Sequence, residues 1–391
     1  MKEGWEYKTL GEVGSFKRGG NFSKKDFVKD GFPCIHYGQI HTKFGIFTEK
    51  HLSCVPANIV KKERCAKKGD LVIAITSEDE EGSCKCTAWM ADYEAYVGGH
   101  TAIYSHTLNP LFMSYYFKSP IFQIEKLNYT HGFKVVEISP KDIAKIKIPI
   151  PSLEEQRRIV SYLDSSFKLI DEIKNKALKS LTEAKALFQS ALAEAMEPKE
   201  GWEEKTLGEL CSIIGGGTPS KKNSSYYNGD IPWATVSDMN CDYLQNTICK
   251  ISDDGVKNSS TQIISKNEVI IATRVGLGKV CILCQDTAIN QDLKGIIPKS
   301  DNKLIRKFIF WWFRSKSNYI VSNGVGATVK GVKLSFVSNL KISLPTISTQ
   351  KQIVSRLDKL SSKVRAIEEK YQKMVEECDA LKQAMLRDVF E

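Results

Sequence analysis

The sequence predicts a mixed α/β protein built from an internal repeat, in which a lobe of strands and short helices is followed, twice, by one long helix. Residues 4–13 recur as residues 201–210 with eight of ten positions identical, and residues 151–164 recur as residues 345–358. The first pair of segments is offset by 197 positions and the second by 194. Because both pairs recur at nearly the same interval, the chain is interpreted as a tandem duplication of one half.

The repeat divides the chain of 391 residues into four segments. Residues 1–150 and 201–344 are expected to form two lobes, and residues 151–200 and 345–391 two long helices. The lobes share little sequence, so two similar scaffolds are expected to hold two different lobes. With 42% hydrophobic and 26% charged residues, a chain of this length suits two or three globular domains, each with its own core.

Within each lobe, short β-rich runs alternate with turns rich in glycine, asparagine and lysine, which predicts strands. One aromatic stretch in each lobe, residues 112–118 and 308–314, has the character of a helix. The density of aromatic residues within a turn and a half favours a place in the core over a platform for stacking bases. The clearest strand-like runs are residues 70–75, 143–148, 268–272 and 337–344.

The two long segments have the heptad pattern of a coiled coil, because apolar residues recur in steps of three and four. Ser152 is placed to cap the first helix, with Glu155 completing a capping box, and Pro198 is placed to end it. The predicted seam consists of Val160, Leu163, Phe167, Ile170, Leu181 and Phe188 in the first helix, and of Val354, Leu357, Val364, Tyr371, Val375 and Met385 in the second.

A helix of this length spans roughly 65 Å at about 1.5 Å per residue and needs a partner along its seam. The second long helix is the natural partner. The pattern by itself leaves a parallel and an antiparallel pair open, although a twofold relation between the repeats would make the pair antiparallel. The alternative is that each helix packs only on its own lobe.

The net charge of +10 lies in the lobes. Residues 1–150 hold 21 Lys and Arg against 17 Asp and Glu, and residues 201–344 hold 18 against 12, which gives +4 and +6. The long segments, with 8 against 9 and 9 against 8, are nearly neutral. This distribution is expected if the lobes meet a polyanion and the helices meet protein, and a solvated surface is the alternative.

The eleven cysteines are odd in number and form no repeated pair of close pairs, which indicates reduced thiols, mostly buried. The one CxxC, Cys281 to Cys284, lies in an apolar strand-like run, so we interpret it as strand core and expect no metal. No apolar run reaches about 18 residues and no signal peptide is evident, so a cytoplasmic protein without a membrane span is expected.

Several motifs in a fixed order point to a known family. Residues 213–222 (IIGGGTPSKK) precede residues 226–233 (YYNGDIPW), and both halves have a Gly-Trp-Glu opening and a Pro-x-x-x-x-Gln helix start. The chain resembles the specificity subunit of type I restriction–modification systems over essentially its whole length. Residues 19–26 and 33–40 of the first lobe resemble a second variety of the same target-recognition domain.

The resemblance implies a non-catalytic subunit in which each lobe reads one half of a split, asymmetric DNA site. It implies that two long antiparallel coiled-coil helices hold the halves apart, within an internal pseudo-twofold repeat. It further implies that the helices dock two methyltransferase subunits, to which restriction subunits can be added. This chain is then expected to bind no cofactor, since S-adenosylmethionine belongs to the methyltransferase subunit.

Candidate DNA contacts are basic, hydroxyl and amide side chains in or near glycine-rich loops. Lysine neutralises phosphates, whereas glutamine, arginine and threonine can read base edges. The alternative for each lysine-rich loop is a solvated turn. The candidates are Lys24, Lys25, Tyr37, Gln39, His131 and Lys134 in the first lobe, and Thr218, Ser220, Lys221, Lys222, Arg274, Lys279 and Lys330 in the second.

No recognisable catalytic motif accompanies these residues. Residues 274–279 lack the spacing of a phosphate loop, which favours a tight turn between strands, and the six histidines show no metal-ligand spacing. Neither a methyltransferase tetrapeptide nor a nucleophile elbow is present, so catalysis is expected from partners. Two alternatives remain: a self-contained DNA methyltransferase or nuclease, and a coiled-coil adaptor without a role in DNA binding.

Overall fold

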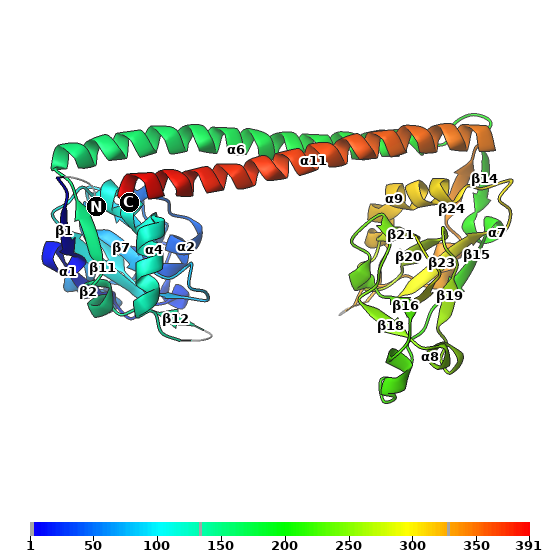
Figure 1. Cartoon of the computed structure of the whole chain (residues 1–391), viewed down its shortest axis with the longest axis horizontal. Helices are drawn as coiled ribbons and strands as arrows, with labels where there is room; N and C mark the ends of the chain where they lie inside the picture. Colours follow the sequence, from blue (N-terminus) through cyan, green and yellow to red (C-terminus); the bar gives the residue numbers. More distant parts are fainter. Residues whose placement is uncertain (1–3, 133–134, 327–328) are drawn as a thin grey trace. The chain divides into compact units, whose positions relative to one another are not determined.

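The computed structural model describes residues 4–132, 135–326 and 329–391 (Figure 1). The chain forms two compact units. Unit 1 comprises Met1–Leu178 with Gln372–Glu391, and unit 2 comprises Lys179–Tyr371. Each unit therefore contains one lobe, together with one stretch of each long helix, α6 (Leu153–Ala195) and α11 (Ile347–Phe390).

The lobe of unit 1 contains a five-stranded sheet of order β2-β11-β7-β9-β4 and a four-stranded sheet of order β5-β3-β10-β6. The five strands are β2 (Gly14–Arg18), β11 (Thr101–His106), β7 (Leu71–Ala74), β9 (Cys86–Trp89) and β4 (Phe47–Thr48). The four strands are β5 (Ser53–Val55), β3 (Phe32–Ile35), β10 (Ala95–Val97) and β6 (Cys65–Ala66). Two further pairs are β1 (Glu6–Thr9) with β13 (Lys147–Ile150), and β8 (Thr76–Ser77) with β12 (Val136–Glu137).

Short helices connect these strands: α1 (Leu10–Val13), α2 (Tyr37–Thr42), α3 (Pro110–Lys118), α4 (Pro120–Lys126) and α5 (Pro140–Ile143). In the lobe of unit 2 they are α7 (Leu207–Leu210), α8 (Asp253–Lys257), α9 (Arg306–Ser322) and α10 (Leu334–Ser338). The aromatic stretches are confirmed as core helices, because Phe112, Tyr116, Phe308 and Phe313 are buried.

The lobe of unit 2 repeats both sheets, with orders β15-β23-β20-β21-β17 and β18-β16-β22-β19. Its five-stranded sheet consists of β15 (Cys211–Gly215), β23 (Leu293–Pro298), β20 (Val269–Ala272), β21 (Val280–Leu283) and β17 (Tyr243–Leu244). Its four-stranded sheet consists of β18 (Cys249–Ile251), β16 (Ile231–Ala234), β22 (Thr287–Ile289) and β19 (Gln262–Ile264), and β14 (Glu203–Thr206) pairs with β24 (Lys341–Leu344).

The two lobes share one topology even though they share little sequence. The same two strand pairs are parallel in both, namely β3 with β10 and β4 with β9 in unit 1, and β16 with β22 and β17 with β21 in unit 2. The duplication seen at the repeated segments therefore extends through both lobes, and the surface loops are where the lobes differ.

Two predicted strands begin later than expected. Residues 143–148 and 337–344 each start in a short helix, α5 or α10, and only Lys147–Ile150 and Lys341–Leu344 are strands. Ser139 caps α5 by accepting a hydrogen bond from the backbone of Asp142 at 3.2 Å, and Pro140 occupies its first turn. Both features favour a helix start, so the prediction was wrong for the first four residues of each run.

The long helices are antiparallel within each unit. In unit 1, Lys174 pairs with Asp379 at 2.6 Å and Asp171 with Lys382 at 2.5 Å, so residue numbers rise along one helix as they fall along the other. In unit 2, Lys185 pairs with Glu368 and Glu194 with Arg356, which shows the same opposite directions. The structure thus decides the orientation that the heptads left open.

The predicted seam is confirmed as the inner face of the helices. Six of its residues are buried and six are partly buried. The alternative, that each helix packs only on its own lobe, is wrong, because α6 and α11 pair with each other. Each helix also packs on the lobe of the other repeat: Phe390 of α11 lies 5.3 Å from Phe112, and Phe188 of α6 lies 5.8 Å from Trp311, between ring centroids. The buried seam residues are Val160, Leu163, Ile170, Phe188, Val354 and Leu357, and the partly buried ones are Phe167, Leu181, Val364, Tyr371, Val375 and Met385.

The Pro-x-x-x-x-Gln motif joins each helix to a lobe. The fully buried Gln156 accepts a hydrogen bond from the backbone N–H of Asn109, the N-cap of α3, and donates one to the carbonyl of its own motif proline, both at 2.9 Å. Gln350 makes the same pair of bonds, with the backbone of Ile305 at α9. The motif therefore aligns the start of a long helix with the start of a lobe helix.

The start of α6 follows the predicted cap in part. The hydroxyl of Ser152 accepts a hydrogen bond from the backbone N–H of Glu155 at 3.2 Å, whereas the carboxylate of Glu155 pairs with Arg158 at 2.7 Å. Helix α6 ends at Ala195, shortly before Pro198. In the described part of the chain, none of the helices has the length and apolar character that crossing a membrane requires.

Candidate nucleic-acid interface

The glycine-rich loop after the first strand of each lobe packs tightly against a second loop. A Cβ on Gly19 would meet the carbonyl oxygen of Gly98, and one on Gly216 would meet the carbonyl oxygens of Ile289 and Asn290. These positions therefore require glycine for close approach of two backbones. In unit 1, the loop that follows β2 is held beside the loop that joins β10 to β11. In unit 2, the loop that follows β15 is held beside the loop that joins β22 to β23. In each lobe these two loops form one edge of the lobe.

In unit 1, Lys24 and Tyr37 lie together on this edge of the lobe. The side chain of Lys24 lies beside Gly38, and the ring of Tyr37 lies 4.4 Å from that of His36 and 5.5 Å from that of His100, between centroids. Burial, followed by the charges of Lys24 and His100, lowers the pKa of His36. Lys25 is exposed one residue further along the same short turn.

His100 is a member of this group that the sequence analysis missed. Its backbone has φ of 61°, in the left-handed region that residues other than glycine seldom adopt. Such strain often marks a functional loop. A histidine after two glycines, at 98–100, is the signal that could have found it.

Gln39 is already engaged within the protein. Its carbonyl oxygen accepts a hydrogen bond from the backbone of His36 at 3.0 Å, and its amide nitrogen donates to the hydroxyl of Ser53 at 2.8 Å. A base contact by Gln39 would have to break one of these bonds, so it is the weakest candidate in this lobe.

His131 lies opposite Glu137 in an antiparallel bridge next to the same edge. Its backbone pairs with Glu137 in both directions, at 2.9 and 2.8 Å, and Glu137 also accepts a hydrogen bond from Arg18 at 2.9 Å. Strand β12, which contains Glu137, pairs with β8, and β8 follows the central strand β7. The side chain of His131 is exposed, and Lys134 lies outside the described residues.

In unit 2, Thr218, Arg274 and Lys330 come together at the equivalent edge. The hydroxyl of Thr218 donates to the side-chain carbonyl of Gln291, and Arg274 pairs with the neighbouring Asp292 at 3.6 Å. The backbone of Arg274 also bridges to Gly331, next to the exposed Lys330. Gln291 was missed by the sequence analysis because its loop has no glycine or lysine.

Ser220, Lys221 and Lys222 are exposed in the turn that follows Thr218. The carbonyl of Ser220 accepts a hydrogen bond from the backbone of Asn223 at 3.1 Å, which closes the turn. The hydroxyl of Tyr227 donates to the carbonyl of Pro219 at 2.7 Å and anchors the turn to the lobe. Two lysine side chains are thus presented to solvent on a braced loop.

Lys279 lies apart from this group. Its ammonium donates to the side chain of Asn240 at 3.0 Å and lines a cleft of about 660 Å³ together with Arg314 and with Gln189 of α6. The structure does confirm the tight turn predicted for residues 274–279, which joins β20 to β21 with positive φ at Val275, Gly276 and Gly278.

The cysteines are all free thiols, and seven of the eleven are buried. Cys281 is buried in β21, as the strand-core reading of the CxxC predicted, whereas Cys284 follows the strand and is partly exposed. The thiol of Cys281 donates to the carbonyl of Cys241 at 2.9 Å. Burial raises the pKa of Cys281 to about 12, so the thiol is held in its protonated form.

Comparison with known proteins identifies the family that this fold and these loops define. A family model described as the type I restriction modification DNA specificity domain matches residues 2–183 and 199–377. The chain belongs to this family and contains two copies of its domain, which confirms the resemblance drawn from the repeated motifs.

Several relatives are specificity subunits of type I restriction enzymes. That of EcoR124I/EcoR124II from Escherichia coli is 32% identical over 238 residues, 58% of this chain and 57% of the relative. That of MjaIX from Methanocaldococcus jannaschii is 30% identical over 165 residues, 41% of this chain and 38% of the relative. That of StySPI from Salmonella potsdam is 22% identical over 426 residues, with 100% and 89% coverage. The chain thus spans little more than half, or less, of the first two relatives.

Solved structures show the same fold. A chain from a study of complex assembly and conformational transition in a type I restriction–modification system has a TM-score of 0.81 at 20% identity, covering 100% of this chain and 98% of its own. The HsdS subunit from Thermoanaerobacter tengcongensis has a TM-score of 0.59 at 19% identity, with 100% and 97% coverage.

Proposed function

We propose that this chain is the DNA-recognition subunit of a type I restriction–modification complex and that each lobe reads one half of a bipartite, asymmetric site. The observation that carries the proposal is the pair of lobes with one topology and different loops. Equivalent edges present Lys24, Tyr37 and His100 in one lobe, and Thr218, Arg274 and Gln291 in the other. Two lobes with the same framework and different loop side chains are suited to reading two half-sites of different sequence.

The charge of the loops supports duplex DNA as the ligand. Lys221, Lys222 and Lys330 are exposed on the candidate edge of unit 2, and Lys24 and Lys25 on that of unit 1. Cationic side chains that neutralise phosphates provide affinity, whereas hydroxyl, amide and guanidinium groups beside them provide base readout. Arg274 is suited to guanine, since its guanidinium can donate two hydrogen bonds to one base edge.

The test is to map methylated adenines in host DNA with and without this chain. We expect a motif with two specified halves and an unspecified spacer, and we expect Arg274→Ala to relax only the half read by unit 2. An uninterrupted motif, or a loss of both halves on substitution of Arg274 alone, would contradict the proposal.

We also propose that methyltransferase subunits dock on the long helices, two for each chain, and that restriction subunits can join that complex. Support comes from an apolar row on the outer face of α6. Tyr162, Leu169 and Ile173, spaced by seven and four residues, are 50%, 60% and 49% exposed. Helices of nearly neutral charge with such a row are suited to packing against another helix.

Co-purification tests the docking. Leu169→Glu with Ile173→Glu is expected to release the methyltransferase without unfolding the chain, whereas Lys168→Glu, an exposed neighbour on α6, serves as the matched control. Retention of two methyltransferase subunits by the doubly substituted chain would remove this face from the proposal.

The chemistry is assigned to the partners. In this proposal S-adenosylmethionine binds to the methyltransferase subunit, this chain has no catalytic residue of its own, and the complex works in the cytoplasm, where the DNA lies. A methyl-transfer assay on the purified chain is expected to show no activity until methyltransferase is added, and transfer by the chain alone would contradict the assignment.

A further inference from the structure

Unit 1 contains a cleft of about 730 Å³ on the side of the lobe that faces α11. Residues of α2, α3, α4 and α11 line it, among them His41, Lys118 and Lys382. Phe44 lines it from the loop after α2, and Lys85 from the turn before β9. A cleft of this size is typical of small-molecule sites. It is separate from the candidate DNA residues, none of which lines it.

The cationic groups of the cleft are only partly neutralised. Lys382 pairs with Asp171 at 2.5 Å, and Asp379, which also lines the cleft, pairs with Lys174 at 2.6 Å. Among the described residues, the ammonium groups of Lys85 and Lys118 have no ion pair or hydrogen bond. One further carboxylate, that of Glu81, lines the cleft.

The surroundings of Lys118 disfavour its charged, protonated form. Burial lowers the pKa of Lys118, and the nearby charges of Lys382 and Lys85 lower it further, against the opposing effects of Cys86 and Asp171. Lys118 and Lys382 are half-buried and Lys85 is exposed beside them, and cations that lie this close together are stabilised by a bound anion.

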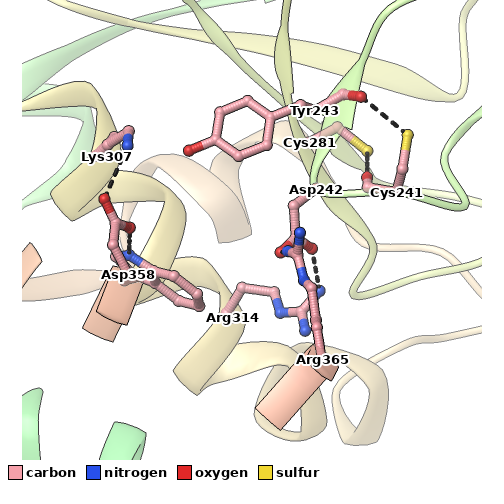
Figure 2. Close-up of polar contacts among 9 residues, drawn as sticks. Cys241, Asp242, Tyr243, Cys281, Lys307, Arg314, Asp358 and Arg365 are labelled. Carbon is pink, nitrogen blue, oxygen red and sulfur yellow. Dashed lines mark hydrogen bonds and ion pairs between the residues drawn. The ribbon is translucent and has the colours of Figure 1, made fainter. Parts of the chain in front are cut away.

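Unit 2 provides an internal comparison, because the cation that its lobe helix places in the equivalent cleft is paired with a carboxylate of the protein. There the buried Asp242 accepts hydrogen bonds from Arg314, at 2.9 Å, and from Arg365 of α11 (Figure 2). Arg314 in α9 occupies the same position as Lys118 in α3. Three residues before Arg314, Trp311 donates a hydrogen bond to Asp358 of α11. Three residues before Lys118, Tyr115 donates one to Asp164, the equivalent residue of α6.

The residue of unit 1 that corresponds to Asp242 is Ile46. The carbonyl of Ile46 accepts a hydrogen bond from the backbone of Ala88 at 2.9 Å, just as the carbonyl of Asp242 accepts one from Ile282 at 2.8 Å. Both residues directly precede the edge strand, β4 or β17. Unit 1 therefore keeps the cation of this site and has an apolar residue in place of the carboxylate.

We propose that the cleft of unit 1 binds a small phosphate-bearing molecule, with Lys118 and Lys85 as the groups that contact the phosphate. A phosphate dianion suits two ammonium groups that have no ion pair better than a singly charged carboxylate does. The rings of Phe44 and His41 offer a partly apolar wall for the rest of the ligand. This site is independent of the DNA-recognition role proposed above.

The test is calorimetric titration of the full chain with inorganic phosphate, adenosine monophosphate and acetate. We expect phosphate and the nucleotide to bind and acetate not to bind. Lys118→Met should weaken binding about tenfold or more, since a charge-assisted hydrogen bond is lost. Ile46→Asp, which installs the carboxylate of unit 2, should weaken it to a similar degree.

Two controls separate this cleft from other cationic surfaces. Lys141→Met removes an exposed charge of the same lobe outside the cleft, and Lys24→Gln with Lys25→Gln removes charge from the candidate DNA edge. Both are expected to leave phosphate binding unchanged, with folding of every variant checked by circular dichroism. The proposal would be overturned if phosphate did not bind, or if acetate bound equally well. It would also be overturned if binding survived both Lys118→Met and Ile46→Asp, or was lost in the Lys24 and Lys25 variant.

Discussion

The side chain of Gln156 accepts a hydrogen bond from the backbone N–H of Asn109 at 2.9 Å, which fixes the start of helix α6 to the start of helix α3. The equivalent bond in unit 2 joins Gln350 to Ile305. A glutamine is suited to this place because one side chain both accepts and donates, so that two buried backbone groups are satisfied at once. The motif that repeats most clearly in the sequence is thus the joint between a lobe and its helix.

Replacing that glutamine should destabilise unit 1. Gln156→Ala leaves the backbone N–H of Asn109 and the carbonyl of Pro151 without a hydrogen-bond partner. Each buried polar group without a partner lowers the free energy of unfolding by about 1–3 kcal/mol. We expect a clear loss in the urea midpoint. Gln352→Ala, an exposed glutamine of α11, is the control and should change the midpoint little.

The seam offers a matched pair of leucines on one helix. Leu163 is fully buried and Leu169 is 60% exposed. Leu163→Ala is expected to reduce the free energy of unfolding by about 2–5 kcal/mol, because it leaves a cavity, whereas Leu169→Ala should cost much less. Equal losses in chemical denaturation would show that the seam is not the inner face.

The salt dependence of DNA binding should report the lysine turn of unit 2. Lys221→Gln with Lys222→Gln removes two exposed cations without removing a structural contact of the turn. The slope of log affinity against log salt should become shallower by about 2, since two counterions fewer are released. Lys359→Gln on α11 is the control, and an unchanged slope in the double variant would place this turn away from DNA.

Acid stability should depend on His106. Burial lowers the pKa of His106 to about 4, below the ordinary value of 6.5. Between these values the unfolded chain binds the proton and the folded chain does not, so stability is complete above about pH 6.5 and falls as the pH approaches 4. His106→Phe keeps the ring beside Tyr104 and removes the titration. The variant should lose less stability than the natural chain between pH 7 and pH 4.5 in urea denaturation, and parallel losses would contradict the assignment.

Much of the architecture was predictable because it depends on local patterns. The heptads set the seam, Pro198 set the end of α6, and the crowded aromatic residues near Phe112 and Phe308 set the core helices. The shared topology of the lobes was not visible, since alternating apolar residues are satisfied by many sequences and the pairing of strands far apart leaves no local signal.

The candidate interface was predictable only for loops that glycine and lysine mark. Lys24 and Thr218 were found in this way, whereas His100 and Gln291 come to the same edges through the β10–β11 and β22–β23 connections, which only the folded chain brings near. Lys279 has the right residue type, but its ammonium is bonded to Asn240. Residue type alone therefore could not separate an exposed loop lysine from a lysine engaged within its own lobe.

The ion pairs along the long helices have a consequence for self-association. Lys174 with Asp379 in unit 1 corresponds to Glu368 with Lys185 in unit 2, so the signs are exchanged between the repeats. If two copies of α6 met in the same antiparallel register, Lys174 would face Lys185, and two copies of α11 would oppose Glu368 to Asp379. Divergence after duplication has thus made pairing of α6 with α11 electrostatically favourable, and pairing of either helix with a second copy of itself unfavourable.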